Sequence, residues 1–180
     1  MRKVLGIDPG LTRCGVAVIE GKSVNKGSLL FTQTIRTASS EDLDQRIHHI
    51  GQQVESYIKN FEPTEIALER VFAQANLRSV MGVAQISGVI LFMARNFNLP
   101  IRFFTPTQVK AAVTGDGRAS KEAVSKMTST LLGAGAVFDT ADSADAAAVA
   151  LTAIANPSME SSQPTKAQRA WSEAIKQSKK

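Results

Sequence analysis

Two short apolar runs flank a tight turn in RKVLGIDPGLTRCGVAVIE, residues 2–20 of the chain. Each run alternates its side chains between two faces, as a β-strand does, which places Asp8 on the same face as Val4. Pro9 and Gly10 end the first strand, because proline donates no backbone hydrogen bond and glycine tolerates turn dihedrals. The stretch therefore predicts a β-hairpin whose first strand ends on a carboxylate.

The carboxylate of Asp8 has two interpretations. It can begin the loop as an Asx-type turn residue, a role that needs no other part of the chain. Alternatively, it is a metal ligand or an acid–base group, and then it needs partners from other elements. The hairpin alone leaves both interpretations open.

Strand-like and helix-like patterns alternate along the rest of the chain. The expected elements are strands at 27–37, 65–69 and 101–104 and helices at 39–61, 77–97, 140–155, from 106 and from 121. Three early strands followed by alternating helices and strands predict an α/β fold, a mixed five-stranded sheet flanked by helices on both faces.

Residues typical of helix starts mark several of these helices. Either Ser39 or Ser40 is expected to cap the first helix, Asn76 the second, and Ser120 the helix that follows a glycine-rich loop. Pro106 is expected at the first position of a short helix, where its missing N–H costs nothing.

The helix expected at 77–97 is apolar nearly all round, so we expect it to be buried on more than one side. Its uncharged stretch, 79–94, is shorter than the roughly 20 residues that a membrane span needs. No membrane association is therefore expected.

Length and composition set broader limits. The 180 residues suffice for one domain with a real core, and the net charge of +5 permits a nucleic-acid partner without demonstrating one. A single cysteine, Cys14, excludes an internal disulfide and fits a reducing cytoplasm. Asp8 interrupts the first apolar run too early for a secretory signal. We expect a domain at 1–155 and a flexible, polar, basic tail at 156–180, which Trp171 could anchor.

Other carboxylates could join Asp8. Glu69 also ends a strand, and neighbouring parallel strands bring their carboxyl ends to one edge of a sheet, where ligands of α/β folds collect; alone, it reads as an exposed strand-end acid. Asp142 and Asp145 lie on one face of an alanine-rich helix, although acids in a first turn are also favoured by the helix dipole. Asp139 also lies three residues from Asp142, so spacing alone does not choose between Asp139 with Asp142 and Asp142 with Asp145. Asp139 precedes Thr140, a plausible helix cap, which favours the pair Asp142 and Asp145.

Four converging carboxylates would repel one another strongly without cations, by about 4 kcal/mol for two charges at 4 Å and an effective dielectric of 20. Two divalent ions about 4 Å apart would neutralise them, one activating the attacking water and the other stabilising the leaving oxygen of a phosphate ester. Oxygen ligands favour Mg²⁺ or Mn²⁺ over zinc. His48 and His49 are adjacent on a helix and point in different directions, so they are not expected to be ligands.

Four motifs, GIDPGLTRCGVAV, LERVF, TPTQVKAAVTGDGRASKEAV and DSADAAAVA, stand in the order and at the spacing of the RuvC family of bacterial Holliday junction resolvases. The resemblance covers residues 2–155. It implies an RNase H-like fold and a homodimer that makes paired symmetric nicks across a four-way DNA junction. It also implies that the metal-binding catalytic acids are Asp8, Glu69, Asp142 and Asp145, which settles the choice between the aspartate pairs.

The same resemblance implies DNA contacts. Phe72, in LERVF, corresponds to an aromatic residue that probes the junction, and stacking on an unpaired base is worth about 1–3 kcal/mol. Lys110 and Lys121 correspond to basic residues near the scissile phosphate, with Lys121 also assigned a catalytic role. Arg118, in the glycine-rich loop, is a further candidate DNA contact. The branch-migration proteins RuvA and RuvB are implied partners.

Three rival functions fit part of the pattern. DPGLT imitates the phosphate loop of actin-like ATPases, but that fold needs two such lobes and a longer chain. A related RNase H-like nuclease could act on RNA instead of DNA. A catalytically dead DNA-binding module is the least favoured, because it has no reason to place four acids against a polyanion.

Overall fold

The computed structural model describes residues 1–70, 77–133 and 135–156. Within these ranges the chain forms one mixed five-stranded sheet in the order β3-β2-β1-β4-β5. The strands are β1 (Arg2–Asp8), β2 (Arg13–Gly21), β3 (Gly27–Arg36), β4 (Glu65–Glu69) and β5 (Ile101–Phe104). β1 and β2 form the predicted antiparallel hairpin, whereas β4 is parallel to both β1 and β5.

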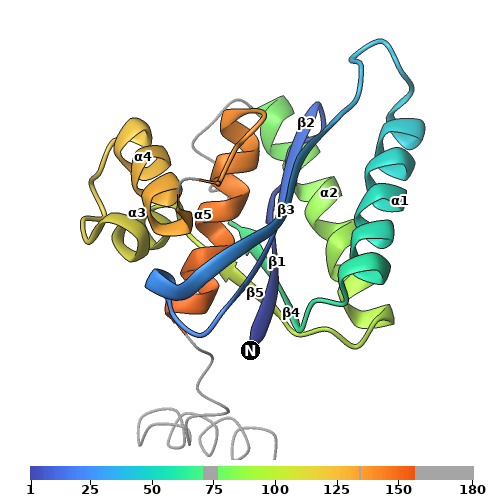
Figure 1. Ribbon diagram of the computed structural model, residues 1–180. Helices are drawn as coiled ribbons and strands as arrows, with labels where there is room; N and C mark the ends of the chain where they lie inside the picture. Colours follow the sequence, from blue (N-terminus) through green and yellow to red (C-terminus); the bar gives the residue numbers. More distant parts are fainter. Residues whose placement is uncertain (71–76, 134, 157–180) are drawn as a thin grey trace, which may run out of the picture.

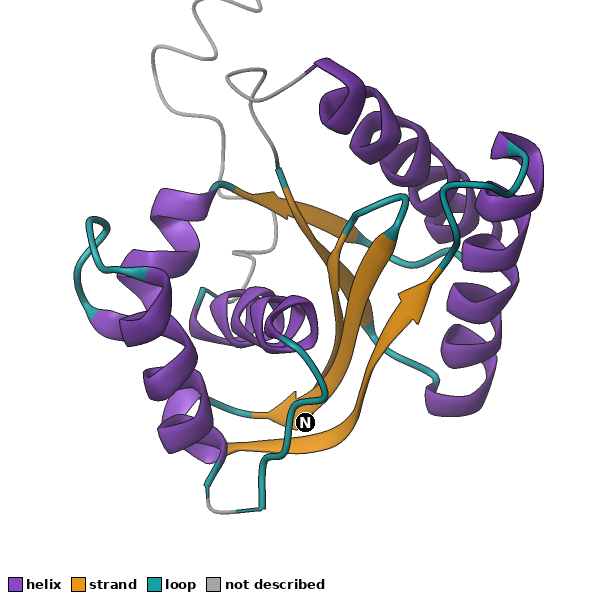
Figure 2. Cartoon of the chain, turned by 90° about the horizontal axis from the view of Figure 1, so that it is seen from above, coloured by secondary structure: helices purple, strands orange, loops and turns teal. Residues whose placement is uncertain are grey.

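Helices cover both faces of this sheet, as predicted (Figure 1). They are α1 (Leu43–Phe61), α2 (Leu77–Asn96), α3 (Pro106–Thr114), α4 (Lys121–Leu132) and α5 (Ala141–Ala155), with a short 3₁₀ turn, η1 (Val24–Lys26), before β3. α1 and α2 lie against one face and α5 lies against the other, with α3 and α4 outside it (Figure 2). Side chains that alternate along β1 separate accordingly, with Val4 in the core beneath α5 and Leu5 in the core beneath α1 and α2.

Close contact between α5 and the sheet depends on small residues on both sides. A Cβ added at Gly6 would lie 2.2 Å from the carbonyl oxygen of Ala146, and one at Gly15 would lie 2.0 Å from that of Asp142. Any larger residue at either glycine would push the helix away. The alanine-rich α5 and these two glycines therefore fix how near the first turn of α5 comes to β1 and β2.

Of the helix starts that the described residues test, those of α3 and α4 follow the sequence signals and that of α1 does not. Ser120 caps α4 by accepting a hydrogen bond from Ala123 N, and Pro106 is the first residue of α3, as predicted. The expected cap of α1 at Ser39 or Ser40 is wrong, because α1 begins after Asp42. The two serines instead occupy a turn that is closed by a 3.2 Å hydrogen bond from Glu41 N to the carbonyl of residue 38.

The prediction that residues 77–97 are buried on more than one side is also wrong for this chain alone. One side of α2 packs in the core through residues such as Ile86 and Ile90. The opposite side exposes large apolar side chains: Met81 is 54% exposed, Leu91 41% and Phe92 67%. α2 lies in the outer layer beside α1, where it can present only one face to the sheet (Figure 2).

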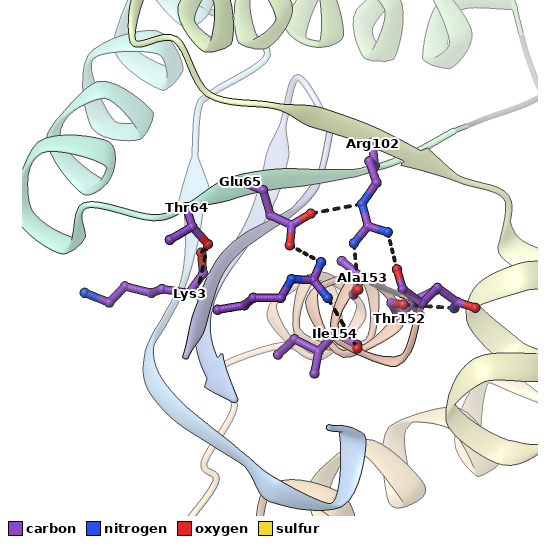
Figure 3. A network of polar contacts seen from close by, with 9 residues as sticks. Lys3, Thr64, Glu65, Arg102, Thr152, Ala153 and Ile154 are labelled. Atoms are coloured by element: carbon purple, nitrogen blue, oxygen red, sulfur yellow. Dashed lines mark hydrogen bonds and ion pairs between the residues drawn. The ribbon is translucent and has the colours of Figure 1, made fainter. Parts of the chain in front are cut away.

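A compact ionic network holds the carboxyl end of α5 to the start of β4 (Figure 3). The Glu65 side chain is only 6% exposed and forms ion pairs with Arg2 and, at 2.9 Å, with Arg102. The same guanidinium of Arg102 donates to the carbonyl oxygens of Ala153, at 2.6 Å, and Asn156. These bonds satisfy carbonyl groups that a helix end leaves without partners.

No helix in the described ranges combines the length and the apolar character that crossing a bilayer requires. Three features expected from the sequence lie outside those ranges: the Asn76 cap, the Phe72 side chain, and the tail from residue 157 with Trp171.

Candidate active site

Two carboxylates stand at the same edge of the sheet because two neighbouring parallel strands end there. Ile7 of β1 pairs with Leu68 of β4, so Asp8 and Glu69, one residue further on, follow the same register. Both side chains alternate onto the face that α5 covers. The predicted meeting of these two strand-end acids is therefore present in the structure.

The first two turns of α5 supply the other acids. The Thr140 side chain caps this helix by accepting a hydrogen bond from Ser143 N at 3.3 Å. Asp142 and Asp145 are both partly buried, on the side of α5 that faces the sheet edge. Asp139 turns away instead: its carboxylate accepts hydrogen bonds from the backbone N and the side-chain oxygen of Thr34, at 3.3 and 3.4 Å. The structure thus separates the two pairs that spacing could not.

The electrostatics of the acid cluster are unfavourable without a cation. Burial, and then the negative charges of Glu69, Asp145 and Asp142, raise the pKa of Asp8 to about 8. Burial and the charge of Asp145 likewise raise the pKa of Glu69. Burial raises the pKa of Asp145 as well, although the neighbouring Lys121 works against it. Groups pushed toward their neutral forms in this way mark candidate functional sites.

Two basic side chains partly offset this charge. Arg13 Nε lies 3.1 Å from Asp142 Oδ2, and Lys121 Nζ lies 3.4 Å from Asp145 Oδ2. Within the described residues, no group of three potential ligands is arranged as a formed metal site. The donor set, four carboxylates and no sulfur or imidazole, fits Mg²⁺ or Mn²⁺.

A cleft of about 140 Å³ brings the acids and the two predicted lysines together. Its polar lining consists of Asp8, Glu69, Asp145, Lys110 and Lys121. The charge of Asp145 raises the pKa of Lys121, which keeps this ammonium protonated beside the acids.

The remaining predicted residues are not part of this lining. Arg118 is exposed in the loop between α3 and α4 and does not line the cleft. His48 and His49 are exposed on α1 and do not line the cleft. The predicted role of Phe72 lies outside the described residues.

Two arginines near the acids were missed. Arg13 begins β2 on the face that α5 covers, so the alternation that placed Asp8 could have found it. Arg46 is a buried residue in the first turns of α1, brought near Asp142 only by the tertiary fold. No local sequence signal distinguishes it from a surface arginine.

Comparison with known proteins assigns the family. A sequence profile described as "Crossover junction endodeoxyribonuclease RuvC" matches residues 4–153. RuvC of Pseudarthrobacter chlorophenolicus is 41% identical over 181 aligned residues, which cover 96% of this chain and 94% of that protein. The chain belongs to the RuvC family. The resemblance predicted from the four motifs is thus confirmed.

Solved structures agree with this assignment. RuvC of T. thermophilus, solved in complex with a Holliday junction substrate, has 32% sequence identity and a TM-score of 0.80, covering 84% of this chain and 92% of that one. The yeast mitochondrial Holliday junction resolvase, with 16% identity and a TM-score of 0.61 over 86% of this chain and 78% of its own, shares the fold. The predicted RNase H-like fold is confirmed.

Membership in the RuvC family also decides between enzyme classes. RuvC proteins are metal-dependent crossover junction endodeoxyribonucleases, so the predicted nuclease activity is confirmed at the level of the family. The actin-like ATPase and the catalytically dead binding module are therefore wrong. The roles of individual site residues stay predictions.

Proposed function

We propose that this RuvC-family chain resolves four-way DNA junctions in recombination and repair, by paired symmetric nicks made by a homodimer. The observation that carries the proposal is the convergence of Asp8, Glu69 and Asp145 with two lysines in one cleft at the sheet edge. Such a cleft combines ligands for divalent cations with positive charge for a phosphate.

Two Mg²⁺ ions per site, replaceable by Mn²⁺, would be held by Asp8, Glu69, Asp142 and Asp145. When bound, they supply an activated water nucleophile and positive charge for the leaving oxygen. The protein holds its four carboxylates on strand ends and a capped helix, which position ligands more rigidly than loops do. Arg13 and Lys121 pair with one oxygen each of Asp142 and Asp145, which leaves the second oxygen of each carboxylate for a cation.

The lysines of the cleft act on the phosphate itself. Lys121 projects from the first turn of α4 beside Asp145, and from there its ammonium can neutralise charge that develops in the transition state. Lys110 lines the same cleft from α3 and contributes a contact to the phosphate. Phe72 is assigned to stacking at the branch point and Arg118 to a peripheral backbone contact.

The homodimer is assigned to the exposed face of α2. Met81, Leu91 and Phe92 leave apolar surface on this helix, and exposed apolar patches mark interaction sites. An interface made of the same helix from each copy is self-complementary about a two-fold axis, which matches the near two-fold symmetry of a junction. Sedimentation at micromolar concentration should show a dimer that Phe92→Glu dissociates; a wild-type monomer that persists on junction DNA contradicts the assignment.

Three further assignments complete the proposal. RuvA and RuvB are its partners in branch migration, and the protein acts in the cytoplasm. The nuclease domain is proposed to span residues 1–155.

The test compares substrates. In Mg²⁺, the protein should nick a four-way DNA junction at symmetric positions on two opposing strands, and should leave linear duplex DNA and structured RNA largely intact. Omitting the metal should abolish cleavage while junction binding persists. Equal cleavage of RNA, or single uncoordinated nicks in the junction, would contradict the proposal.

A further inference from the structure

A second hollow, of about 610 Å³, lies beside the acid cluster on the side of Asp142. Its lining includes the β1–β2 loop that directly follows Asp8, with Arg13, Arg46 and Asp142 around it. Asp142 lines this hollow and Asp145 lines the cleft, so the first turns of α5 border both spaces. A DNA strand whose scissile phosphate sits at the acids has a neighbouring phosphate to place nearby.

Arg46 is the unusual residue of this hollow. It is only 9% exposed. Its Nε donates to the Thr37 hydroxyl and its Nη2 donates to the Thr12 hydroxyl, both at 2.9 Å. Both acceptors are neutral, and none of the ion pairs in the described part of the chain includes Arg46. A buried guanidinium without an anion is costly, so its retention calls for a negatively charged partner.

The guanidinium of Arg46 keeps donors that the threonines do not engage. Two of its five N–H groups are engaged by the threonines, and no fully buried side-chain polar atom in the described residues lacks a hydrogen-bond partner. Nη1 of Arg46, which neither threonine engages, is therefore not fully buried, and Arg46 lines the hollow. With Arg13 and Asp142 also in the lining, the hollow carries a net positive charge.

We propose that this hollow binds a backbone phosphate of the DNA strand, next to the phosphate that is cut. Arg46, held in place by the two threonine hydroxyls, offers its remaining donors as a fixed fork, the geometry that suits a phosphate. Arg13, at the rim of the hollow, supplies a second positive charge. This inference rests on the proposed function, because it takes DNA as the ligand.

The test measures junction binding without metal, so that cleavage does not interfere. Removing the charge in Arg46→Gln should lower the slope of log affinity against log salt by about 0.9, the value for one phosphate contact on B-DNA. A scan of the junction with single neutral methylphosphonates locates that phosphate. One position beside the cleavage site should weaken wild-type binding and have no further effect on Arg46→Gln.

Arg46 also braces the β1–β2 loop, because the Thr37 hydroxyl that accepts from it donates to the carbonyl of Leu11 at 2.6 Å. Thr37→Val is the matched control: it breaks this brace and keeps the charge. It should lower the melting temperature and retain the full salt slope. If Arg46→Gln does not fold, Arg13→Gln replaces it, since its side chain is 58% exposed; it should lose the response at the same phosphate.

An unchanged salt slope and an unchanged methylphosphonate scan in a folded Arg46→Gln protein would overturn this inference and leave the brace as its whole role. That result leaves junction resolution intact as long as the wild type still binds and cuts the junction. A wild type that binds no junction overturns the proposed function instead, and the phosphate site with it.

Discussion

Glu65 and Glu69 lie at the two ends of β4, on the same face of the sheet and against opposite ends of α5. Glu65 has an arginine at each carboxylate oxygen and is nearly buried. Glu69 lies among other acids, and burial together with the charge of Asp145 raises its pKa. One strand thus carries a fully compensated carboxylate at its start and an uncompensated one at its end.

The difference separates structural charge from functional charge. Around Glu65, each positive group has its partner within the chain, and α5 gains hydrogen bonds for its last carbonyl groups. Around Glu69, the protein holds negative charge together at a cost to its own stability. Such a cost persists at sites where a ligand, here the metal that the family requires, provides the missing compensation.

The largest expected effect comes from a substitution in the acid cluster at the Glu69 end of β4, which we call the functional end. Asp8→Asn removes the charge of one proposed metal ligand and keeps the shape of the side chain, so cleavage of the junction should fall below detection. Junction binding should survive, since backbone phosphate contacts provide most of the affinity. Cleavage and filter binding of the same protein preparation check this.

A turn-residue role for Asp8 makes the opposite prediction. Asparagine caps such turns about as well as aspartate, so Asp8→Asn would then cleave normally. A cleaving variant would falsify the metal site.

The second effect comes from a substitution at the Glu65 end of β4, the structural end. Glu65→Gln leaves Arg2 and Arg102 without their carboxylate, and breaking a buried ion pair typically costs about 3 kcal/mol. We expect a lower free energy of unfolding by about that amount and nearly normal turnover below the melting temperature. The control is Glu55→Gln, whose ion pair with Lys59 is exposed and should contribute less than about 0.5 kcal/mol. Equal losses in both variants would contradict the comparison.

The two ends of β4 also differ in how far the sequence predicts them. Asp8 and Glu69 could be brought together from alternation and parallel strand order, which are local patterns, and the motifs then supplied Asp142 and Asp145. The network at Glu65, by contrast, joins this residue to Arg2, which is 63 positions away in the sequence, and to Arg102, which is 37 positions away. Nothing local marks such a pairing.

Other errors of the sequence analysis have the same origin. The start of α1 depended on a turn at 38–41 that competes with capping, and the exposed side of α2 depended on the position of that helix in the outer layer. Arg46 was missed because its partners are distant in sequence: Thr12 lies in the loop between β1 and β2, and Thr37 directly follows β3. The periodicity of a sequence shows which face of a helix or strand is apolar, but it does not show which other part of the chain packs against that face.

A smaller effect sharpens the functional end. Lys121→Ala should lower turnover about 100-fold, the lower range for removing one group that stabilises charge in a transition state, with junction affinity nearly unchanged. Lys126→Ala, an exposed lysine on the same helix, is the control. If Lys121→Ala weakens binding and leaves turnover intact, the lysine contacts the phosphate only in the ground state.

The smallest effect is a dependence of stability on pH that belongs to the functional end. The folded pKa of Asp8, about 8, lies above the ordinary value of 3.8. The stability that comes with its neutral form is therefore complete below about pH 4 and is lost as pH rises through about 8. Between pH 6 and 7, the metal-free wild type should lose about 1.4 kcal/mol of unfolding free energy relative to Asp8→Asn.

Added Mg²⁺ should restore stability to the wild type more than to the variant, because it binds only the folded acids. Glu65→Gln, which leaves the acid cluster untouched, should keep the wild-type pH profile at a lower overall stability. Urea unfolding at the two pH values, with and without Mg²⁺, measures all three proteins. Parallel profiles for wild type and Asp8→Asn would mean that Asp8 is already ionised in the folded protein, and that the two ends of β4 differ less than their neighbours imply.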